Sequence, residues 1–189
     1  MFTPAQAEPF DIITGVINAD ELLFSVDENN NPIDPQPRKF SHDHGIWHRA
    51  CHVWIVGKDL RILCQQRSLL KDSNPGRWEP FFGGHLGPGQ DYSTVALTEV
   101  REELGLLIDI SDLRFFDEYK YTAGTEYQAV FVLEWDGEIA GLNLEKEEVQ
   151  QVAWRSLAEV RRNVVEEQKQ SWTFIGYEQD LLCWLPSQF

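Results

Sequence analysis

The chain has few of the features that secretion, disulfide cross-linking or membrane insertion require. Its 189 residues include three cysteines, and no apolar run approaches the ~18 residues of a membrane-spanning helix. The first ten residues, MFTPAQAEPF, have neither a basic start nor an apolar centre. An odd number of widely spaced cysteines (Cys51, Cys64 and Cys183) predicts reduced, mostly buried thiols. We therefore expect a cytoplasmic protein that does not enter a membrane.

Basic residues are also scarce. Lysine and arginine number 16 against 31 aspartates and glutamates, which gives a formal net charge of -15. Such a surplus repels the phosphate backbone, so a nucleic acid polymer is not an expected partner. The same surplus suits an enzyme that collects Mg²⁺ or Mn²⁺, since hard cations prefer carboxylate oxygen. A merely solvated acidic surface explains the charge equally well.

The length and the 42% hydrophobic content predict one domain with one sizeable core. We interpret residues 1–40 as an N-terminal extension of this domain. It holds a mixed apolar segment, which could form a strand or hairpin, followed by the turn-forming sequence VDENNNPIDPQPR.

Strand and turn patterns follow from His52 onward. HVWIV and LRILCQQ read as two strands of a hairpin joined at GKD, and a turn at Asn74, Pro75 and Gly76 leads into the loop FFGGHLGPGQ. A helix is predicted over Tyr92–Leu104, because Asp91 is a good N-cap and Gly105 a good C-terminal stop.

The second half of the chain predicts further strands and helices. LLIDI, LRFFDEYKYT and YQAVFVLEW read as strands, while SLAEVRRNVVEEQ and the segment around YEQDLLCWL read as helices. This mixture predicts an α/β or α+β sandwich.

Three glutamates carry the strongest chemical signal. Glu99, Glu102 and Glu103 lie at positions i, i+3 and i+4 of the predicted helix, which places three carboxylates on one face. Like charges so placed disfavour an isolated helix, and a bound divalent cation would compensate them. A solvated acidic face is the alternative reading. The Gly-rich loop directly before the helix favours the cation, because glycines let the backbone approach a metal-bound diphosphate.

The segment GGHLGPGQDYSTVALTEVREELGL resembles the Nudix box, which Gly84 begins. The resemblance implies a Nudix hydrolase domain over residues 41–189, folded as an α/β/α sandwich with a mixed sheet and a loop-helix metal site. It further implies that Glu99 and Glu102 are catalytic, and that metal is bound by Glu99, Glu102, Glu103 and the Gly83 carbonyl.

Two positions depart from the family pattern. Gln90 stands where the family has glutamate, and Thr98 stands where it has an arginine that helps to orient a catalytic glutamate. The departure at Thr98 puts the turnover rate in doubt more than metal binding. A Nudix-fold module that binds a nucleotide without cleaving it therefore stays open.

Residues 42–106 also resemble the branch of the superfamily related to isopentenyl-diphosphate isomerase, through HGIWHRACHVWIV, QQRSLLKDSNPGRWEP and the box. That resemblance implies metal-binding roles for His48 and His85, and diphosphate contacts from Arg67 and Lys71. Gly84 and His85 are further candidates for substrate binding. The wider histidine run of His42, His44, His48 and His52 either binds a transition metal or belongs to turns and strands. Against isomerase chemistry, Gly83 occupies the position of the isomerase's catalytic cysteine.

The sequence thus predicts a metal-dependent hydrolase that cuts a diphosphate linkage in a small molecule, such as a nucleoside diphosphate linked to another group. The general base is a glutamate of the box or a later carboxylate, Glu147 or Glu148. Aromatic residues that either stack on the substrate or pack in the core are Phe81, Phe82, Tyr119, Tyr121 and Tyr127. Related enzymes are often dimers, so a homodimer is a further expectation.

Overall fold

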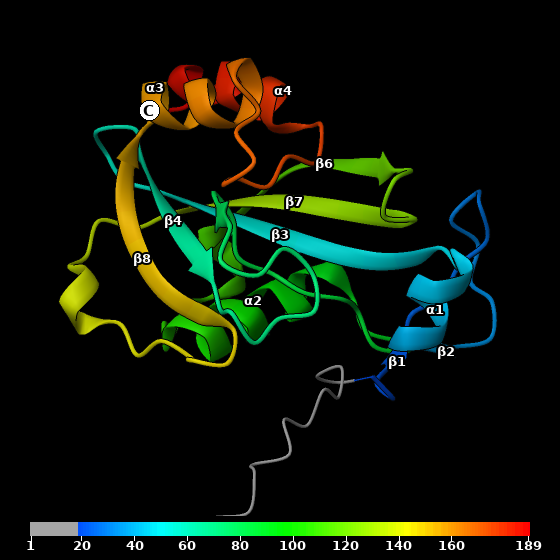
Figure 1. Cartoon of the computed structure of the whole chain (residues 1–189). Helices are drawn as coiled ribbons and strands as arrows, with labels where there is room; N and C mark the ends of the chain where they lie inside the picture. The colour runs from blue at the N-terminus through cyan, green and yellow to red at the C-terminus, as the bar shows by residue number, and fades with distance from the viewer. Residues whose placement is uncertain (1–18) are drawn as a thin grey trace, which may run out of the picture.

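A mixed six-stranded sheet lies between two helical layers in the computed structural model, which describes residues 19–189 (Figure 1). The strands are β3 (His48–Val56), β4 (Arg61–Arg67), β5 (Trp78–Glu79), β6 (Leu113–Tyr121), β7 (Glu126–Glu134) and β8 (Val149–Ser156). Their order is β5-β4-β3-β7-β6, and β8 pairs with β4. The predicted α/β/α sandwich with a mixed sheet is confirmed.

The parallel pair β3 and β7 forms the centre of the sheet. Nine consecutive residue pairs join them, from His48 opposite Glu126 to Val56 opposite Glu134. Both strands are apolar in nearly every position after their first residues, as expected for strands covered on both faces. Polar side chains at the start of each strand therefore meet at one end of the sheet.

The sheet divides between β3 and β4. These strands pair only at Ile55 with Leu63 and at Val56 with Ile62. Farther along, the free edge of β3 is taken by the Gly-rich loop, where bridges join Val53 to Phe82 and Ala50 to His85. The loop is thereby held inside the sheet, next to the helix that follows it.

Helix α2 (Tyr92–Leu104) covers one face, as predicted. The Asp91 side chain accepts a hydrogen bond from the Thr94 N–H, and Gly105 ends the helix with φ of 70°. Val95, Ala96, Val100 and Leu104 pack under the sheet against Val53 and Ile55, among other core residues. This packing turns the glutamate face of α2 toward the loop.

The opposite face is covered by C-terminal helices: α3 (Leu157–Val160), the π-helix η3 (Arg161–Glu166), α4 (Glu178–Trp184) and the 3-10 turn η4 (Leu185–Ser187). They enclose a second apolar cluster around Trp54 and Val130. The helix predicted from Ser156 is confirmed at its N-cap, since the Ser156 hydroxyl accepts from the Glu159 N–H. Its second half widens into a π-helix.

An N-terminal segment packs beside the start of β3. It contains β1 (Leu22–Leu23), β2 (Gln36–Pro37) and α1 (Arg38–His44). The first two pair antiparallel, in line with the early hairpin expected there. Leu23 is fully buried, and α1, which the sequence did not predict, crosses the boundary expected at residue 40. The part of the extension before residue 19 lies outside the described residues.

One predicted strand is wrong. LLIDI does not pair with any strand of the described chain, and the 3-10 turn η1 (Ile110–Asp112) follows it directly. The Asp109 and Asp112 side chains each accept a backbone N–H of the other's neighbourhood in a capping box, which turns the chain before β6 begins. The sequence also left β8 unassigned as a strand, because its VQQVAWRS alternation is short and starts among charged residues. A further 3-10 turn, η2 (Ile139–Gly141), precedes β8.

No helix among residues 19–189 has the length and apolar character needed to span a bilayer. Cys51 and Cys64 are buried free thiols, whereas Cys183 is exposed.

Candidate functional site

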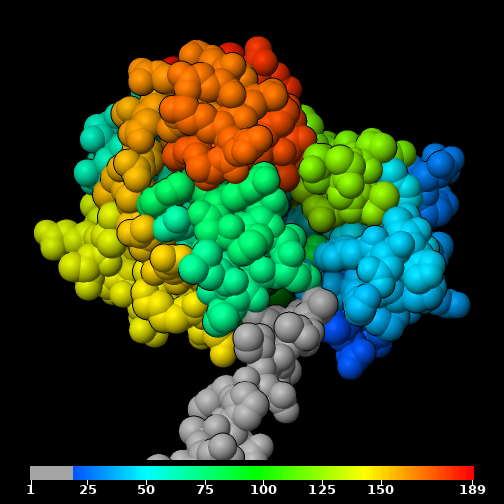
Figure 2. Space-filling view, viewed as in Figure 1, coloured from blue at the N-terminus to red at the C-terminus, as the bar shows by residue number. Residues whose placement is uncertain are grey.

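A cavity of about 820 Å³ opens where the sheet divides. On the surface, a hollow lies between the segment around residues 70–80, α1 and the turn between β6 and β7 (Figure 2). Its cationic lining residues are Arg38, Arg67 and Lys71. Its glutamate lining residues are Glu21, Glu79, Glu99, Glu102, Glu103, Glu126, Glu145 and Glu148. A diphosphate could enter so acidic a cavity only together with cations.

The three glutamates of α2 converge on this cavity, as their helical spacing predicted. Glu103 is 4% exposed, and its Oε1 accepts a hydrogen bond of 3.2 Å from the Gly83 N–H. Its Oε2 is buried without a hydrogen-bond partner among the described residues. Burial and the neighbouring Glu99 raise the pKa of Glu103 well above its usual range. Burial, with Glu102 and Glu148 nearby, raises the pKa of Glu99 to about 7.

The loop needs glycine at positions 83 and 84. A Cβ on Gly83, whose φ is 151°, would lie 2.0 Å from the Cys51 carbonyl oxygen. A Cβ on Gly84 would lie 2.5 Å from Oε1 of Glu99. The loop therefore runs against β3 on one side and against a carboxylate of α2 on the other, and no side chain fits in either contact.

Gly83→Ala is expected to destabilise the fold by more than ~2 kcal/mol, because the new methyl group meets backbone at a φ that alanine rarely adopts. Thermal unfolding would measure this. Gly141→Ala is the matched control, since nothing lies within 4 Å of its added Cβ. Equal melting temperatures for the two variants would contradict the tight contact at Gly83.

The two cations predicted to contact a diphosphate both line the cavity, but each is already paired with an acid. Arg67 donates to Glu79 at 3.1 Å and, through its other nitrogens, to the carbonyl and hydroxyl of Ser73. Lys71 forms an ion pair with Glu148. Contact with a phosphate would require these side chains to exchange or share their acidic partners.

A second group of potential metal ligands faces the same cavity. Ligand atoms of His42, His48, His85 and Glu126 all lie within 4.8 Å of one another. Nε2 of His48 and Nε2 of His85 are 3.8 and 3.7 Å from Oε1 of Glu126. Nδ1 of His48 is 2.8 Å from the Ile46 carbonyl, so the proton resides on Nδ1, and its Nε2 is buried without a hydrogen-bond partner in the described chain.

Electrostatics agree with a ligand role for this cluster. Burial lowers the pKa of His48 to about 4 and also lowers that of His42, so both rings are neutral near pH 7. Hydrogen bonding to His85 and the charge of its neighbours lower the pKa of Glu126 to about 2, against the effect of burial. Neutral imidazoles beside a carboxylate are what a transition metal or Mn²⁺ requires.

The rest of the histidine run divides in two. His44 lies outside the cavity lining and stacks on Phe40, whereas His52 lines the cavity. Among the aromatic candidates, Phe81 and Tyr121 line the cavity, and Phe82 is fully buried in the core. The remaining two pack against other rings, Tyr119 against Tyr177 and Tyr127 against Trp47.

The two departures from the Nudix box lie outside the cavity lining. The Gln90 side chain accepts a 2.5 Å hydrogen bond from the Gly87 N–H and so closes the turn of its own loop. Thr98 donates to the Thr94 carbonyl one turn earlier on the helix. Neither side chain contacts Glu99, Glu102 or Glu103 through a hydrogen bond.

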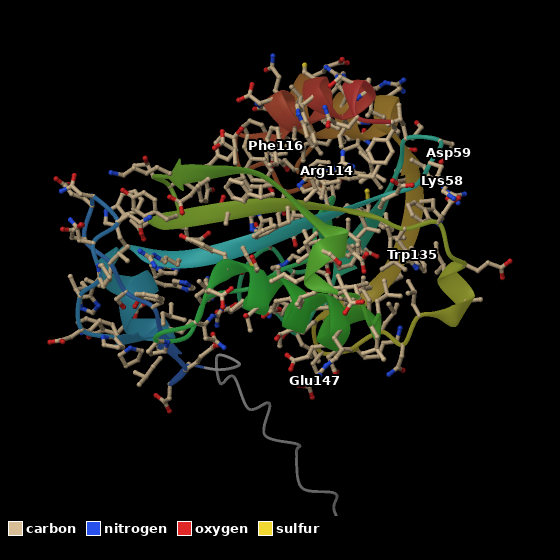
Figure 3. The ribbon with its side chains drawn as sticks, turned by 180° about the vertical axis from the view of Figure 1, so that it is seen from behind. Lys58, Asp59, Arg114, Phe116, Trp135 and Glu147 are labelled. Atoms are coloured by element: carbon tan, nitrogen blue, oxygen red, sulfur yellow. The ribbon has the colours of Figure 1, made fainter. Side chains whose placement is uncertain are left out.

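Sequence reasoning missed Glu126 and Glu145 as cavity residues. Glu126 begins β7, and its position opposite His48 follows from the parallel register with β3. Such pairing joins segments almost 80 residues apart and has no local signal. Glu148 lines the cavity, as one of the two later carboxylates was expected to do, whereas Glu147 is exposed and lies on the outer surface (Figure 3).

Comparison with known proteins assigns the family. The family model for the NUDIX domain matches residues 46–174, about two thirds of the chain. The chain therefore belongs to the Nudix family. An uncharacterised Nudix hydrolase of Streptomyces coelicolor is 30% identical over 140 residues, which cover 72% of this chain and 74% of that protein. An isopentenyl-diphosphate Delta-isomerase of Serratia proteamaculans is 27% identical over 145 residues, 75% of this chain and 79% of the isomerase.

Solved structures agree on the fold. A protein of Deinococcus radiodurans superposes with a TM-score of 0.68 at 18% identity, covering 86% of this chain and 98% of that one. The NUDIX domain of Shewanella oneidensis NrtR, crystallised with ADP ribose, gives a TM-score of 0.56 at 12% identity, covering 75% of this chain and 88% of that domain. Similarity to both Nudix hydrolases and the isomerase bears out the two resemblances of the sequence.

Proposed function

We propose that this Nudix protein cleaves a diphosphate linkage in a small molecule by substitution of water at phosphorus, and that it requires Mg²⁺ or Mn²⁺. The observation that carries the proposal is the convergence of Glu99, Glu102 and Glu103 on one cavity, directly beside the Gly83–Gly84 backbone. Membership of a family of hydrolases supports it. The ADP ribose bound to the Shewanella domain illustrates a ligand of suitable chemistry.

The residues present fit a hard divalent ion. Oε2 of Glu103 is buried without a hydrogen-bond partner in the described chain, and three carboxylates stand close enough to raise the pKa values of two of them. A carboxylate set of this kind suits Mg²⁺ or Mn²⁺. Glu99, Glu102, Glu103 and the Gly83 carbonyl would hold the metal, and a bound divalent ion neutralises charge on diphosphate oxygens.

The other residues of the cavity have distinct tasks in this proposal. Lys71 and Arg67 would contribute positive charge to the diphosphate after sharing their acids. Glu148 is the later carboxylate that could accept a proton from water, since it lines the cavity. Glu147 is set aside because it points into solvent. An α2 glutamate is the other candidate base.

We further propose that His42, His48, His85 and Glu126 bind a second metal ion, as the resemblance to the isomerase implies for two of them. His48→Gln is then expected to weaken that ion's affinity by 10–100-fold or more. Metal content after dialysis against Mn²⁺ or Zn²⁺ would measure this. His44→Gln is the matched control, because His44 lies outside the cluster. Unchanged metal content in His48→Gln would contradict the site.

An isomerase is the second candidate, favoured by this histidine cluster and by the isomerase among the relatives. The absence of a thiol opposes it. No cysteine of the described residues lines the cavity, and burial raises the pKa values of Cys51 and Cys64 far above their usual range. Position 83 also has no room for a cysteine side chain.

One experiment separates the two candidates. ADP-ribose and isopentenyl diphosphate are incubated with the protein and Mg²⁺, and the products are followed by NMR. Hydrolysis converts diphosphate phosphorus signals into those of phosphomonoesters. Isomerisation leaves the diphosphate intact and moves the double bond, which proton spectra detect. Double-bond movement without phosphomonoester formation would overturn the proposed hydrolase function.

A further inference from the structure

His52 lines the cavity beyond the metal-ligand candidates and takes no part in the function proposed above. It lies on β3 two residues past Ala50, which pairs with Gln128 of β7. Paired and diagonal positions on adjacent strands share a face of the sheet, so His52 and Gln128 form one polar wall. The exposed fractions of these side chains are 8% and 1%.

A hydrogen-bond relay fixes the protonation of His52. Nε1 of Trp54 lies 3.2 Å from the Tyr177 hydroxyl, and that hydroxyl lies 2.7 Å from Nδ1 of His52. Because an indole N–H can only donate, the hydroxyl oxygen accepts from Trp54. The hydroxyl proton then has one acceptor among the described residues, which is Nδ1 of His52. Tyr177 is 2% exposed, so leaving that proton unpaired would be costly.

The imidazole therefore carries its proton on Nε2. Burial lowers the pKa of His52 to about 4, which keeps the ring neutral near pH 7 with a single N–H. Stacking on Phe81, at 3.9 Å between ring centroids and 14° between planes, holds the ring orientation. Nε2 has no hydrogen-bond partner in the described chain, yet it is not among the atoms sealed from solvent. It is a preset donor at the cavity surface.

Gln128 adds to the polar character of this wall. Its amide nitrogen lies 2.5 Å from Oε2 of Glu126, which fixes the amide orientation, because a flipped carbonyl would face the carboxylate. Its Oε1 is buried without a partner among the described residues. A hydrocarbon group packed on this wall would cover the His52 N–H and offer neither side chain a hydrogen bond.

We propose that His52 is a specificity-determining residue whose Nε2–H binds an acceptor atom on the group attached to the diphosphate. The favoured substrate class is then a nucleoside diphosphate derivative, whose base and ribose carry such acceptors, in preference to an isoprenoid diphosphate. This inference rests on the proposed function for its location in the substrate cavity. It can be tested without turnover.

The test is binding of ADP, CDP, GDP, UDP and geranyl diphosphate by calorimetry with Mg²⁺, using wild type, His52→Phe and Tyr177→Phe. Wild type should bind at least one nucleotide more tightly than geranyl diphosphate. His52→Phe should weaken that nucleotide by roughly 10–100-fold and leave geranyl diphosphate unaffected or tighter. Tyr177→Phe keeps the imidazole but releases its tautomer, so a smaller loss is expected. His44→Phe, outside the cavity, is the matched control and should match wild type.

Nitrogen-15 NMR of wild-type histidines supplies a readout independent of any variant's folding, with the His52 signal identified by its absence from the spectrum of His52→Phe or by sequential assignment. The expected result is a proton on Nε2 of His52. A proton on Nδ1, or equal losses for nucleotide and geranyl diphosphate, would overturn the inference. Selective nucleotide binding without phosphate-bond cleavage would instead refute the proposed hydrolase function and leave the role of His52 standing.

Discussion

Glu102→Gln is expected to lower metal-dependent diphosphate cleavage by about 100-fold or more while the fold stays intact. Glu102 is exposed on α2 and lines the cavity, so the substitution removes one negative oxygen from the metal-ligand set and little else. An exposed-face substitution of this kind usually changes stability by less than ~0.5 kcal/mol. Initial rates at saturating Mg²⁺, with thermal unfolding alongside, would measure both quantities.

The chain offers a matched control for that result. Glu147→Gln makes the same chemical change on an exposed side chain that lies on the outer surface, away from the cavity (Figure 3). It should retain wild-type turnover. If Glu102→Gln and Glu147→Gln had the same activity, the assignment of Glu102 as a metal ligand would be refuted, because both variants lose one negative charge.

Glu103→Gln is expected to abolish metal-dependent turnover and, at the same time, to stabilise the metal-free protein. The wild-type carboxyl is buried beside Glu99, which raises its pKa well above the usual range. A glutamine keeps an oxygen that can accept from the Gly83 N–H but carries no charge. We expect a melting temperature a few degrees higher at pH 8, since ~1 kcal/mol corresponds to about 2–4 °C for a chain of this size.

The pH dependence gives the sign of this effect. A carboxyl whose folded-state pKa exceeds its unfolded value lowers stability as pH rises between the two values, because the unfolded chain releases the proton first. The limiting slope is about 1.4 kcal/mol per pH unit. The advantage of Glu103→Gln should therefore be absent near pH 4, grow toward neutral pH, and shrink when Mg²⁺ stabilises the wild type. An advantage that grew as pH fell would contradict the burial argument.

Local chemistry made much of the fold predictable. The caps Asp91 and Gly105 defined α2, and the residue spacing along it placed three glutamates on one face before any tertiary contact was known. The GKD turn defined the hairpin of β3 and β4. Each of these features depends on residues within one or two turns of chain, where propensity and capping dominate.

Features that depend on distant segments were not predictable. The parallel register that brings Glu126 to His48 and the pairing of Lys71 with Glu148 join parts of the chain more than 70 residues apart. Likewise, Arg67 and Lys71 were expected as free diphosphate contacts, whereas the folded chain gives each an acidic partner. The relay from Trp54 through Tyr177 to His52 joins β3 to the start of the C-terminal helix α4 (Figure 1).

The measurement that tests the central claim most directly is product release from a panel of nucleoside diphosphate derivatives, dinucleoside polyphosphates and isoprenoid diphosphates. Each is incubated with Mg²⁺, with Mn²⁺ and with excess chelator. We predict cleavage of at least one compound that requires metal and stops with chelator. Binding of these compounds without cleavage of any, or cleavage that persists in chelator, would contradict a metal-dependent hydrolase built on the glutamates of α2.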